Sequence, residues 1–138
     1  MMQVGRLGLA VGRFGRSPAV LLGAELVANG DFAADANWTK GSGWSIAGGV
    51  ATITGASGSP NLSQDVGLIA GRYYRFVITV TRSAGGVALY AGLAGVAFSM
   101  FASGTYEARL RAAGTSLIYI QAGNGFTGTI DNVSCRRA

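Results

Sequence analysis

The carboxylates are the side chains of this chain that could carry acid–base chemistry, because the sequence contains no histidine. Histidine is the commonest general base, and its absence also excludes a Ser-His-Asp triad. A glycoside hydrolase would need two carboxyl groups that face each other across one cleft. Glu107 alternates with arginines, which indicates a solvated position, and no two of the other acids form an evident pair. We therefore expect a protein that is not an enzyme. The acids are Glu25, Asp31, Asp35, Asp65, Glu107 and Asp131.

The single cysteine, Cys135, excludes an internal disulfide and a cluster of thiolate metal ligands. Its neighbours Arg136 and Arg137 could lower the pKa of the thiol and make it reactive. The simpler interpretation is that Cys135 is the last inward-facing residue of the closing strand.

Gly123, Gly125 and Gly128 have the spacing of a dinucleotide-binding fingerprint. In that fingerprint a helix follows the glycines, and its N-terminus binds the phosphates. Here a strand pattern follows instead, so we interpret these glycines as a tight hairpin turn.

The composition indicates one folded domain of short strands and tight turns. The chain has 138 residues, of which 49% are hydrophobic and 12% are charged. This balance excludes disorder, which needs low hydrophobicity and high charge. The 23 glycines are more than double the usual share of about 7%, which favours strands joined by turns.

The basic residues do not form a nucleic-acid-binding pattern. The formal net charge is +5, and every basic residue except Lys40 is an arginine. The arginines are dispersed along strands, and no nucleic-acid-binding motif is present. Arginine also pairs with carboxylates, which suits a protein interface. Since no apolar run approaches about 18 residues, no membrane-spanning helix is expected either.

Residues 1–23 have a pattern of their own, and we expect an extended docking arm there, in front of one domain at 24–138. Val4-Gly5-Arg6-Leu7-Gly8 recurs as Val11-Gly12-Arg13-Phe14-Gly15. The glycines oppose a helix, since each destabilises a helix interior by about 1 kcal/mol. An extended arm cannot bury its own apolar side chains, so they would lie on a neighbouring chain; the alternative is a mobile terminus. The expected docking residues are Arg6, Leu7, Leu9, Val11, Arg13, Phe14 and Arg16.

The rest of the chain has the alternation of an all-β protein. The segments 44–47 and 50–54 flank Gly48-Gly49, which predicts a two-residue hairpin with Ile46 opposite Ala51. Residues 72–82 form the longest predicted strand, with alternate residues on one apolar face.

The closing strand changes phase. Phe126 and Ile130 share one face, but Val133 and Cys135 continue on the opposite parity, which predicts a bulge at Asp131-Asn132. With further strands, the total of nine or ten antiparallel strands predicts a jelly-roll β-sandwich. Those further strands are expected at 25–28, 62–66, 87–93, 96–101, 106–111 and 117–120.

Six short motifs give residues 25–135 a resemblance to a known family. In chain order they are Asn29-Gly30-Asp31-Phe32, Gly43-Trp44, Gly48-Gly49-Val50-Ala51, Leu62-Ser63-Gln64-Asp65-Val66, Ala70-Gly71-Arg72-Tyr73-Tyr74 and Gly128-Thr129-Ile130-Asp131-Asn132-Val133. Their order and spacing resemble the jelly-roll carbohydrate-binding modules and their galactose-binding-like relatives. Such modules recur in secreted glycosidases and in the tail and head proteins of bacteriophages.

Together with the arm, the resemblance implies a non-enzymatic bacteriophage virion structural protein. It would be a capsid decoration or tail-fibre component on the outer surface of the head or tail. It would dock on other virion proteins through the arm and form a homo-oligomer, with a trimer favoured, and it could adhere to host-surface glycans. The alternative is a stand-alone or appended carbohydrate-binding module.

In this family, sugar rings stack on exposed aromatic side chains. The glycan-binding residues that the resemblance implies are Trp38, Tyr73, Tyr90 and Tyr119. Trp38 lies in a polar loop and is expected to be exposed, whereas Trp44 is expected in the core. The alternative for the tyrosines is packing at the sandwich edges, with the hydroxyl groups in water.

Family members often hold a structural calcium between the start of the first strand and the last strand. Asp131 matches the acid of the closing strand and Asp31 lies near the opening one, but Ala33 stands where another acid is typical. Calcium needs roughly six to eight oxygen ligands. We therefore expect no cofactor, with a calcium ion near Asp31 and Asp131 as the less favoured alternative.

Overall fold

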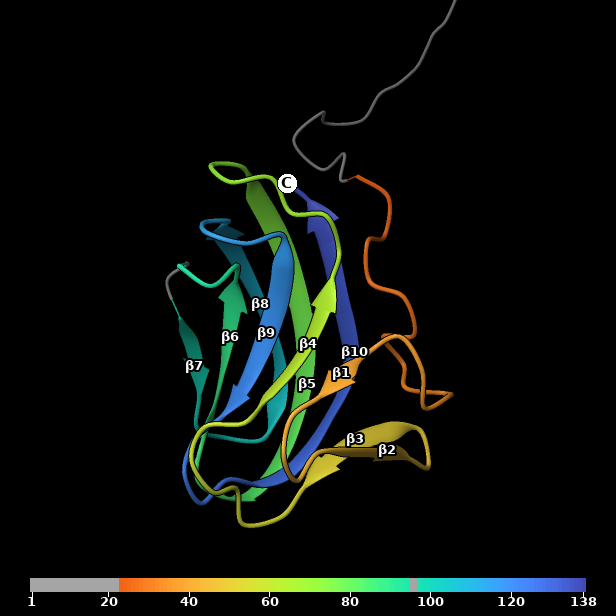
Figure 1. The fold of residues 1–138 in the computed structure, drawn as a ribbon, viewed down its shortest axis with the longest axis vertical. Helices are drawn as coiled ribbons and strands as arrows, with labels where there is room; N and C mark the ends of the chain where they lie inside the picture. The colour runs from red at the N-terminus through yellow and green to blue at the C-terminus, as the bar shows by residue number, and fades with distance from the viewer. Residues whose placement is uncertain (1–22, 95–96) are drawn as a thin grey trace, which may run out of the picture.

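The computed structural model describes residues 23–94 and 97–138, and these form two five-stranded antiparallel sheets packed face to face (Figure 1). The first sheet has the order β1-β4-β9-β6-β7, with β1 at Thr39–Lys40, β4 at Asn61–Asp65, β9 at Leu117–Ala122, β6 at Val87–Ala91 and β7 at Phe98–Met100. The second has the order β2-β3-β10-β5-β8, with β2 at Ser45–Ala47, β3 at Val50–Ile53, β10 at Thr127–Arg137, β5 at Tyr73–Ala84 and β8 at Gly104–Arg111. The predicted all-β jelly-roll sandwich is confirmed. The described residues contain no helix that could cross a membrane.

The predicted hairpin is the connection between β2 and β3. Gly48 and Gly49 have φ angles of +62° and +80°, a left-handed conformation that glycine adopts without strain. Ile46 lies opposite Ala51, as the two-residue turn requires.

The core lies between the two sheets and follows the period-two pattern. In β5 the even-numbered residues from Tyr74 to Val80 are buried, and in β9 Ile118 and Ile120 are buried opposite them. The odd-numbered residues of both strands point outward. Parity along each strand therefore determines which side chains are available for binding.

The phase change in the closing strand is a β-bulge, as predicted. The register of β10 against β5 shifts between Asp131 and Ser134, and Asn132 has a φ of +50°. The extra residue turns Val133 and Cys135 inward, and both are buried.

The prediction of a strand at 25–28 is wrong, although that segment does run beside β10 (Figure 1). Gly23 and Leu26 donate backbone hydrogen bonds to the carbonyls of Arg137 and Cys135. Between them, the backbone N–H of Cys135 is bonded to the Glu25 carboxylate instead of a backbone carbonyl. This side-chain bond interrupts the ladder, so the first strand of the structure is β1.

The predicted docking arm falls almost entirely outside the described residues. Its seven docking residues, from Arg6 to Arg16, all lie in 1–22. Gly23 contacts β10 and belongs to the sandwich.

Candidate functional site

Two of the predicted glycan-binding residues, Tyr90 and Tyr119, lie together on the outer face of the first sheet. Tyr90 of β6 and Tyr119 of β9 are direct cross-strand partners. Their strand neighbours Leu89 and Ile120 are buried, so the two phenol rings are on the solvent side. Directly opposed side chains in antiparallel strands are within about 5.5 Å at Cβ, so the rings form one aromatic surface.

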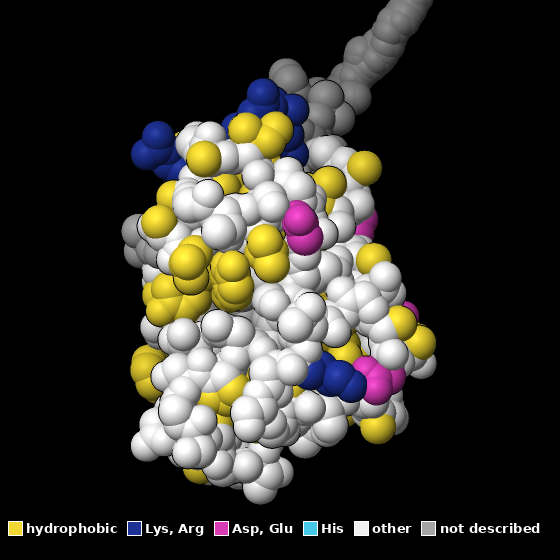
Figure 2. Space-filling view, in the orientation of Figure 1, with side chains coloured by type: hydrophobic (Ala, Val, Ile, Leu, Met, Phe, Trp, Pro, Cys, Tyr) yellow, Lys and Arg dark blue, Asp and Glu magenta, His cyan; other side chains and the backbone are white. Residues whose placement is uncertain are grey.

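A pocket of about 170 Å³ lies beside this aromatic pair. Its wall comes from three adjacent strands and the segment after β6, which is why residues far apart in sequence meet there. The lining residues are Asn61, Tyr90, Leu93, Tyr119 and Gln121. Figure 2 views this face and shows hydrophobic side chains gathered over β6 and β9.

Some polar groups around the tyrosine pair already form hydrogen bonds within the protein, and others are free to bond to a ligand. Thr115 accepts the Leu93 N–H at 3.2 Å and donates its hydroxyl to the Tyr119 oxygen at 3.3 Å. The Tyr119 hydroxyl hydrogen therefore stays available as a donor. The Tyr90 hydroxyl reaches the Gln121 side-chain oxygen at 3.5 Å, a long contact.

Asn61 lines the pocket, but its side-chain oxygen is not accessible to a ligand there. Its side-chain oxygen is shielded from solvent and receives no hydrogen bond from residues 23–94 or 97–138. A shielded acceptor without a donor is unfavourable by about 1–3 kcal/mol.

A second hollow, of about 290 Å³, lies beside the first, and Gln121 lines both. Ala88, Ser99 and Asn124 line it, and at its end lies Phe101, which is 69% exposed. The Phe101 ring rests on Gly86, where a Cβ atom would come within 2.3 Å of it. The two hollows form a groove across the outer face of β9 and β6.

The expectation that Trp38 is exposed is wrong, and this residue is not part of the groove. Trp38 is only 8% exposed; its ring packs on Phe32 at 5.2 Å, and its N–H bonds to the Asn29 carbonyl at 3.0 Å. A buried indole offers no face to a sugar ring. Trp44 is buried, as expected.

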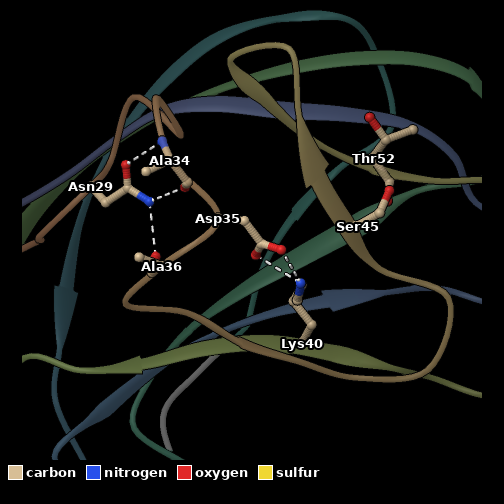
Figure 3. Close-up of polar contacts among 7 residues, drawn as sticks. All are labelled: Asn29, Ala34, Asp35, Ala36, Lys40, Ser45 and Thr52. Atoms are coloured by element: carbon tan, nitrogen blue, oxygen red, sulfur yellow. Dashed lines mark hydrogen bonds and ion pairs between the residues drawn. The ribbon is translucent and has the colours of Figure 1, made fainter.

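Asn29 explains the burial of Trp38 by folding the loop that precedes β1. Figure 3 shows the Asn29 amide between the two backbone segments of this loop; it donates to the carbonyls of Ala34 and Ala36 and accepts the Ala34 N–H. Asp35 pairs with Lys40 at 2.7 Å at the end of the same loop. The polar residues lie on the outside of the loop, and Phe32 and Trp38 point into the core.

Tyr73 lies away from the groove, on the outer face of the second sheet. It is 41% exposed at the start of β5, and the Arg109 guanidinium lies 4.0 Å above its ring centre. The sandwich thus separates Tyr73 from the Tyr90–Tyr119 pair.

Asp31 and Asp131, the two acids considered for a calcium ion, both make local hydrogen bonds. Each carboxylate accepts a nearby backbone N–H, from Ala33 and Asn132 respectively. The described ranges contain no group of three or more acids, cysteines or histidines that could hold a metal. The expectation of no cofactor stays a prediction.

Glu25 instead joins the opening segment to the closing strand. Its carboxylate accepts the Ser134 hydroxyl at 2.5 Å, the Cys135 N–H at 2.8 Å and the Val27 N–H at 3.1 Å. Partial burial opposes ionisation, but these hydrogen bonds and the charge of Arg136 outweigh it and lower the pKa of Glu25.

Cys135 is a core residue and not a reactive thiol. Burial, reinforced by the negative charge of Glu25, raises the pKa of Cys135 to about 12. The simpler of the two interpretations of this cysteine is the correct one.

Sequence reasoning missed Asn61, Leu93, Phe101 and Gln121 as residues of the groove. Gln121 follows Tyr119 by two residues in one strand, so its parity could have identified it. The other three depend on the order β4-β9-β6-β7, which no local pattern reveals.

No protein-family model and no curated protein matches the sequence, but solved structures match the fold. A TmCBM61 carbohydrate-binding module in complex with β-1,4-galactotriose is 22% identical with a TM-score of 0.59, and the match covers 83% of this chain and 99% of that chain. The CBM1 module of BiXyn10A is 18% identical with a TM-score of 0.59, covering 85% of this chain and 98% of that chain.

The enzymatically active domain of tailspike protein 4 from bacteriophage CBA120 also matches. It is 17% identical with a TM-score of 0.54, and the match covers 96% of this chain but 26% of that chain. These identities support a statement about fold alone: the chain has the jelly-roll β-sandwich fold of carbohydrate-binding modules.

Proposed function

We propose that this protein is a non-enzymatic carbohydrate-binding module that binds a glycan on the outer face of its first sheet. The observation that carries this proposal is the cross-strand pair Tyr90–Tyr119 beside a pocket that Asn61 and Gln121 also line. The fold shared with carbohydrate-binding modules supports it.

The groove has the chemistry that sugar binding needs. The C–H face of a pyranose ring packs on an aromatic surface, and its hydroxyl groups need donors and acceptors at the rim. Tyr90 and Tyr119 supply the surface, and the Tyr119 hydroxyl supplies a donor.

The length of the groove favours a glycan chain over a single sugar. The two hollows meet at Gln121, with the tyrosine pair at one end and Phe101 at the other. An oligosaccharide could therefore contact aromatic rings at both ends.

A glycan array with the full chain tests the proposal. It should include neutral linear oligosaccharides, among them β-1,4-linked galactose oligomers, because a module of the same fold was solved with such a ligand. We expect a neutral oligosaccharide to bind, with titration calorimetry to measure its affinity. Failure of every neutral glycan to bind at millimolar concentration would contradict the proposal.

A role on the outside of a bacteriophage virion is a second proposal. The match of fold to a bacteriophage tailspike over 96% of the chain supports it. In this role the arm would dock the domain on other virion proteins, and a trimer is the favoured oligomer. Deleting residues 1–22 should leave a folded domain that no longer joins particles; normal incorporation of the truncated chain would refute the docking role.

A further inference from the structure

The second sheet carries a row of three arginines on its outer face. Arg136 of β10 lies opposite Arg75 of β5, and Arg75 lies opposite Arg109 of β8. Arg136 and Arg75 are on the solvent side because their strand neighbours Cys135, Tyr74 and Phe76 are buried. Arg109 is itself exposed. Adjacent strands are about 4.8 Å apart, so the backbone positions of the three arginines form a line across the sheet. We call these residues the arginine row.

The arginine row carries more positive charge than the described residues neutralise. Like charges directly opposite each other in a sheet are destabilising. Glu107 pairs with Arg75 at 3.2 Å and Glu25 pairs with Arg136 at 3.6 Å, whereas Arg109 lies over the Tyr73 ring. Arg111 follows on β8, opposite Tyr73, and adds a fourth positive charge.

Two further observations leave the excess positive charge of the arginine row without a partner: one of its N–H groups has no acceptor among the described residues, and the first residues of the chain supply no acid. The Nε–H group of Arg75 is shielded from solvent and has no acceptor within residues 23–94 and 97–138. Residues 1–22 contain no acid that could pair with the row.

We propose that the arginine row binds a polysaccharide that carries carboxylate groups, as uronic acid polymers do. Guanidinium groups bind carboxylates with two parallel hydrogen bonds, and two members of the row already hold glutamate carboxylates. A linear chain with repeated charges can contact several members of the row at once.

The surface disfavours two other polyanions. A single-stranded nucleic acid would need several exposed rings for its bases, but Tyr73 is the one exposed ring that the described residues place on this face, and Arg109 already stacks on it. An acidic protein would need a larger apolar area, and Tyr73 is the only large exposed hydrophobic side chain that the described residues place on this face of β5, β8 and β10.

The test measures binding of the full chain to polygalacturonate, with neutral dextran, dextran sulfate and single-stranded DNA as comparisons. We expect polygalacturonate to bind and neutral dextran to fail. Raising NaCl from about 50 to about 200 mM should weaken binding by about tenfold, because salt screens these charges.

Two double variants with the same change in net charge test whether binding depends on the arginine row or only on the net charge of the protein. Arg75→Gln with Arg109→Gln should weaken polygalacturonate binding by about tenfold. Arg82→Gln with Lys40→Gln, which leaves the row intact, should change it little. Equal losses in both variants would overturn the proposal, and thermal unfolding checks that both remain folded.

The remaining outcomes are equally decisive. Absence of polygalacturonate binding overturns the proposal, and equal affinity for dextran sulfate overturns the preference for carboxylates. Competition by single-stranded DNA at equal charge would assign the row to nucleic acid instead. Tyr119→Ala should leave polygalacturonate binding unchanged, so this result does not depend on the neutral glycan site.

Discussion

The carboxylate of Glu25 accepts the backbone N–H of Cys135 at 2.8 Å, which ties the start of the described chain to its closing strand. The second carboxylate oxygen accepts the Ser134 hydroxyl, so one side chain holds two consecutive residues of β10. The resemblance to carbohydrate-binding modules implies that a calcium ion could join these segments. In this chain an acid with hydrogen bonds joins them directly.

We predict that Glu25→Ala lowers the free energy of unfolding by about 2 kcal/mol, because it leaves the partly buried Cys135 N–H without an acceptor. Glu25→Gln should cost less, since an amide oxygen can still accept the Cys135 and Val27 N–H groups. Denaturant unfolding at neutral pH measures both. Glu107→Gln is the control, because the Glu107 side chain is 59% exposed; an equal loss in that variant would contradict this role for Glu25.

The same carboxylate should make the stability depend on pH. The pKa of Glu25 is lower in the folded protein than the ordinary value of 4.5. Its ionised form therefore stabilises the fold fully above about that pH, and this contribution is lost as the pH falls through the folded pKa. Between neutral and acidic pH, the free energy of unfolding should fall more in the wild type than in Glu25→Gln. Parallel curves for the two proteins would exclude this contribution.

We predict that the Cys135 thiol does not react in the folded protein. The side chain is fully buried and the pKa of the thiol is raised to about 12, so the thiolate is neither accessible nor populated at neutral pH. A thiol reagent with a chromogenic product should react only as fast as the domain unfolds, and at once in denaturant. Rapid stoichiometric labelling of the folded chain would show that the closing strand is open.

Local patterns predicted the parts of the fold that depend on neighbouring residues. The glycine pair fixed the hairpin, and the phase change located the bulge at Asp131-Asn132. Parity placed Tyr119 on the outer face, but its partnership with Tyr90 depends on β6 lying beside β9. No pattern within either strand contains that information.

Trp38 shows why sequence patterns do not predict which loop residues are buried. Its neighbours are polar, which is typical of an exposed loop, but the loop is folded by the Asn29 side chain through residues five and seven positions away. Asn29 and Asn37 adopt the left-handed backbone conformation that asparagine tolerates well, but Phe32 also adopts it, which its side chain does not predict. The burial of a loop residue depends on such contacts and not on the polarity of adjacent residues.

For the glycan site, we predict that Tyr119→Ala weakens binding of the neutral oligosaccharide found on the array by about tenfold, which corresponds to about 1.4 kcal/mol. The ring supplies half of the aromatic surface that it shares with Tyr90. Tyr119→Phe keeps the ring and removes only the hydroxyl donor, so its loss should be smaller. Titration calorimetry measures both affinities.

The matched control for this site is Tyr73→Ala. Tyr73 is also an exposed tyrosine, but it lies on the second sheet under Arg109, so its removal should not change the affinity for a neutral glycan. A larger loss in Tyr73→Ala than in Tyr119→Ala would move the site to the other face of the sandwich.

If the proposed glycan site extends to Phe101, we predict that Gly86 and Phe101 control the length of the glycan that binds. A Cβ atom at position 86 would lie 2.3 Å from the Phe101 ring, so Gly86→Ala should displace that ring from the end of the groove. Because Phe101 is largely exposed, it can move with little loss of stability. We expect Gly86→Ala and Phe101→Ala each to weaken binding of the longer oligosaccharides while leaving the shortest ligand unaffected.

Combining the two substitutions in one variant should weaken binding little further than either alone, since both remove the same contact. Full additivity in calorimetric affinities, or equal losses for short and long ligands, would mean that the glycan does not reach Phe101.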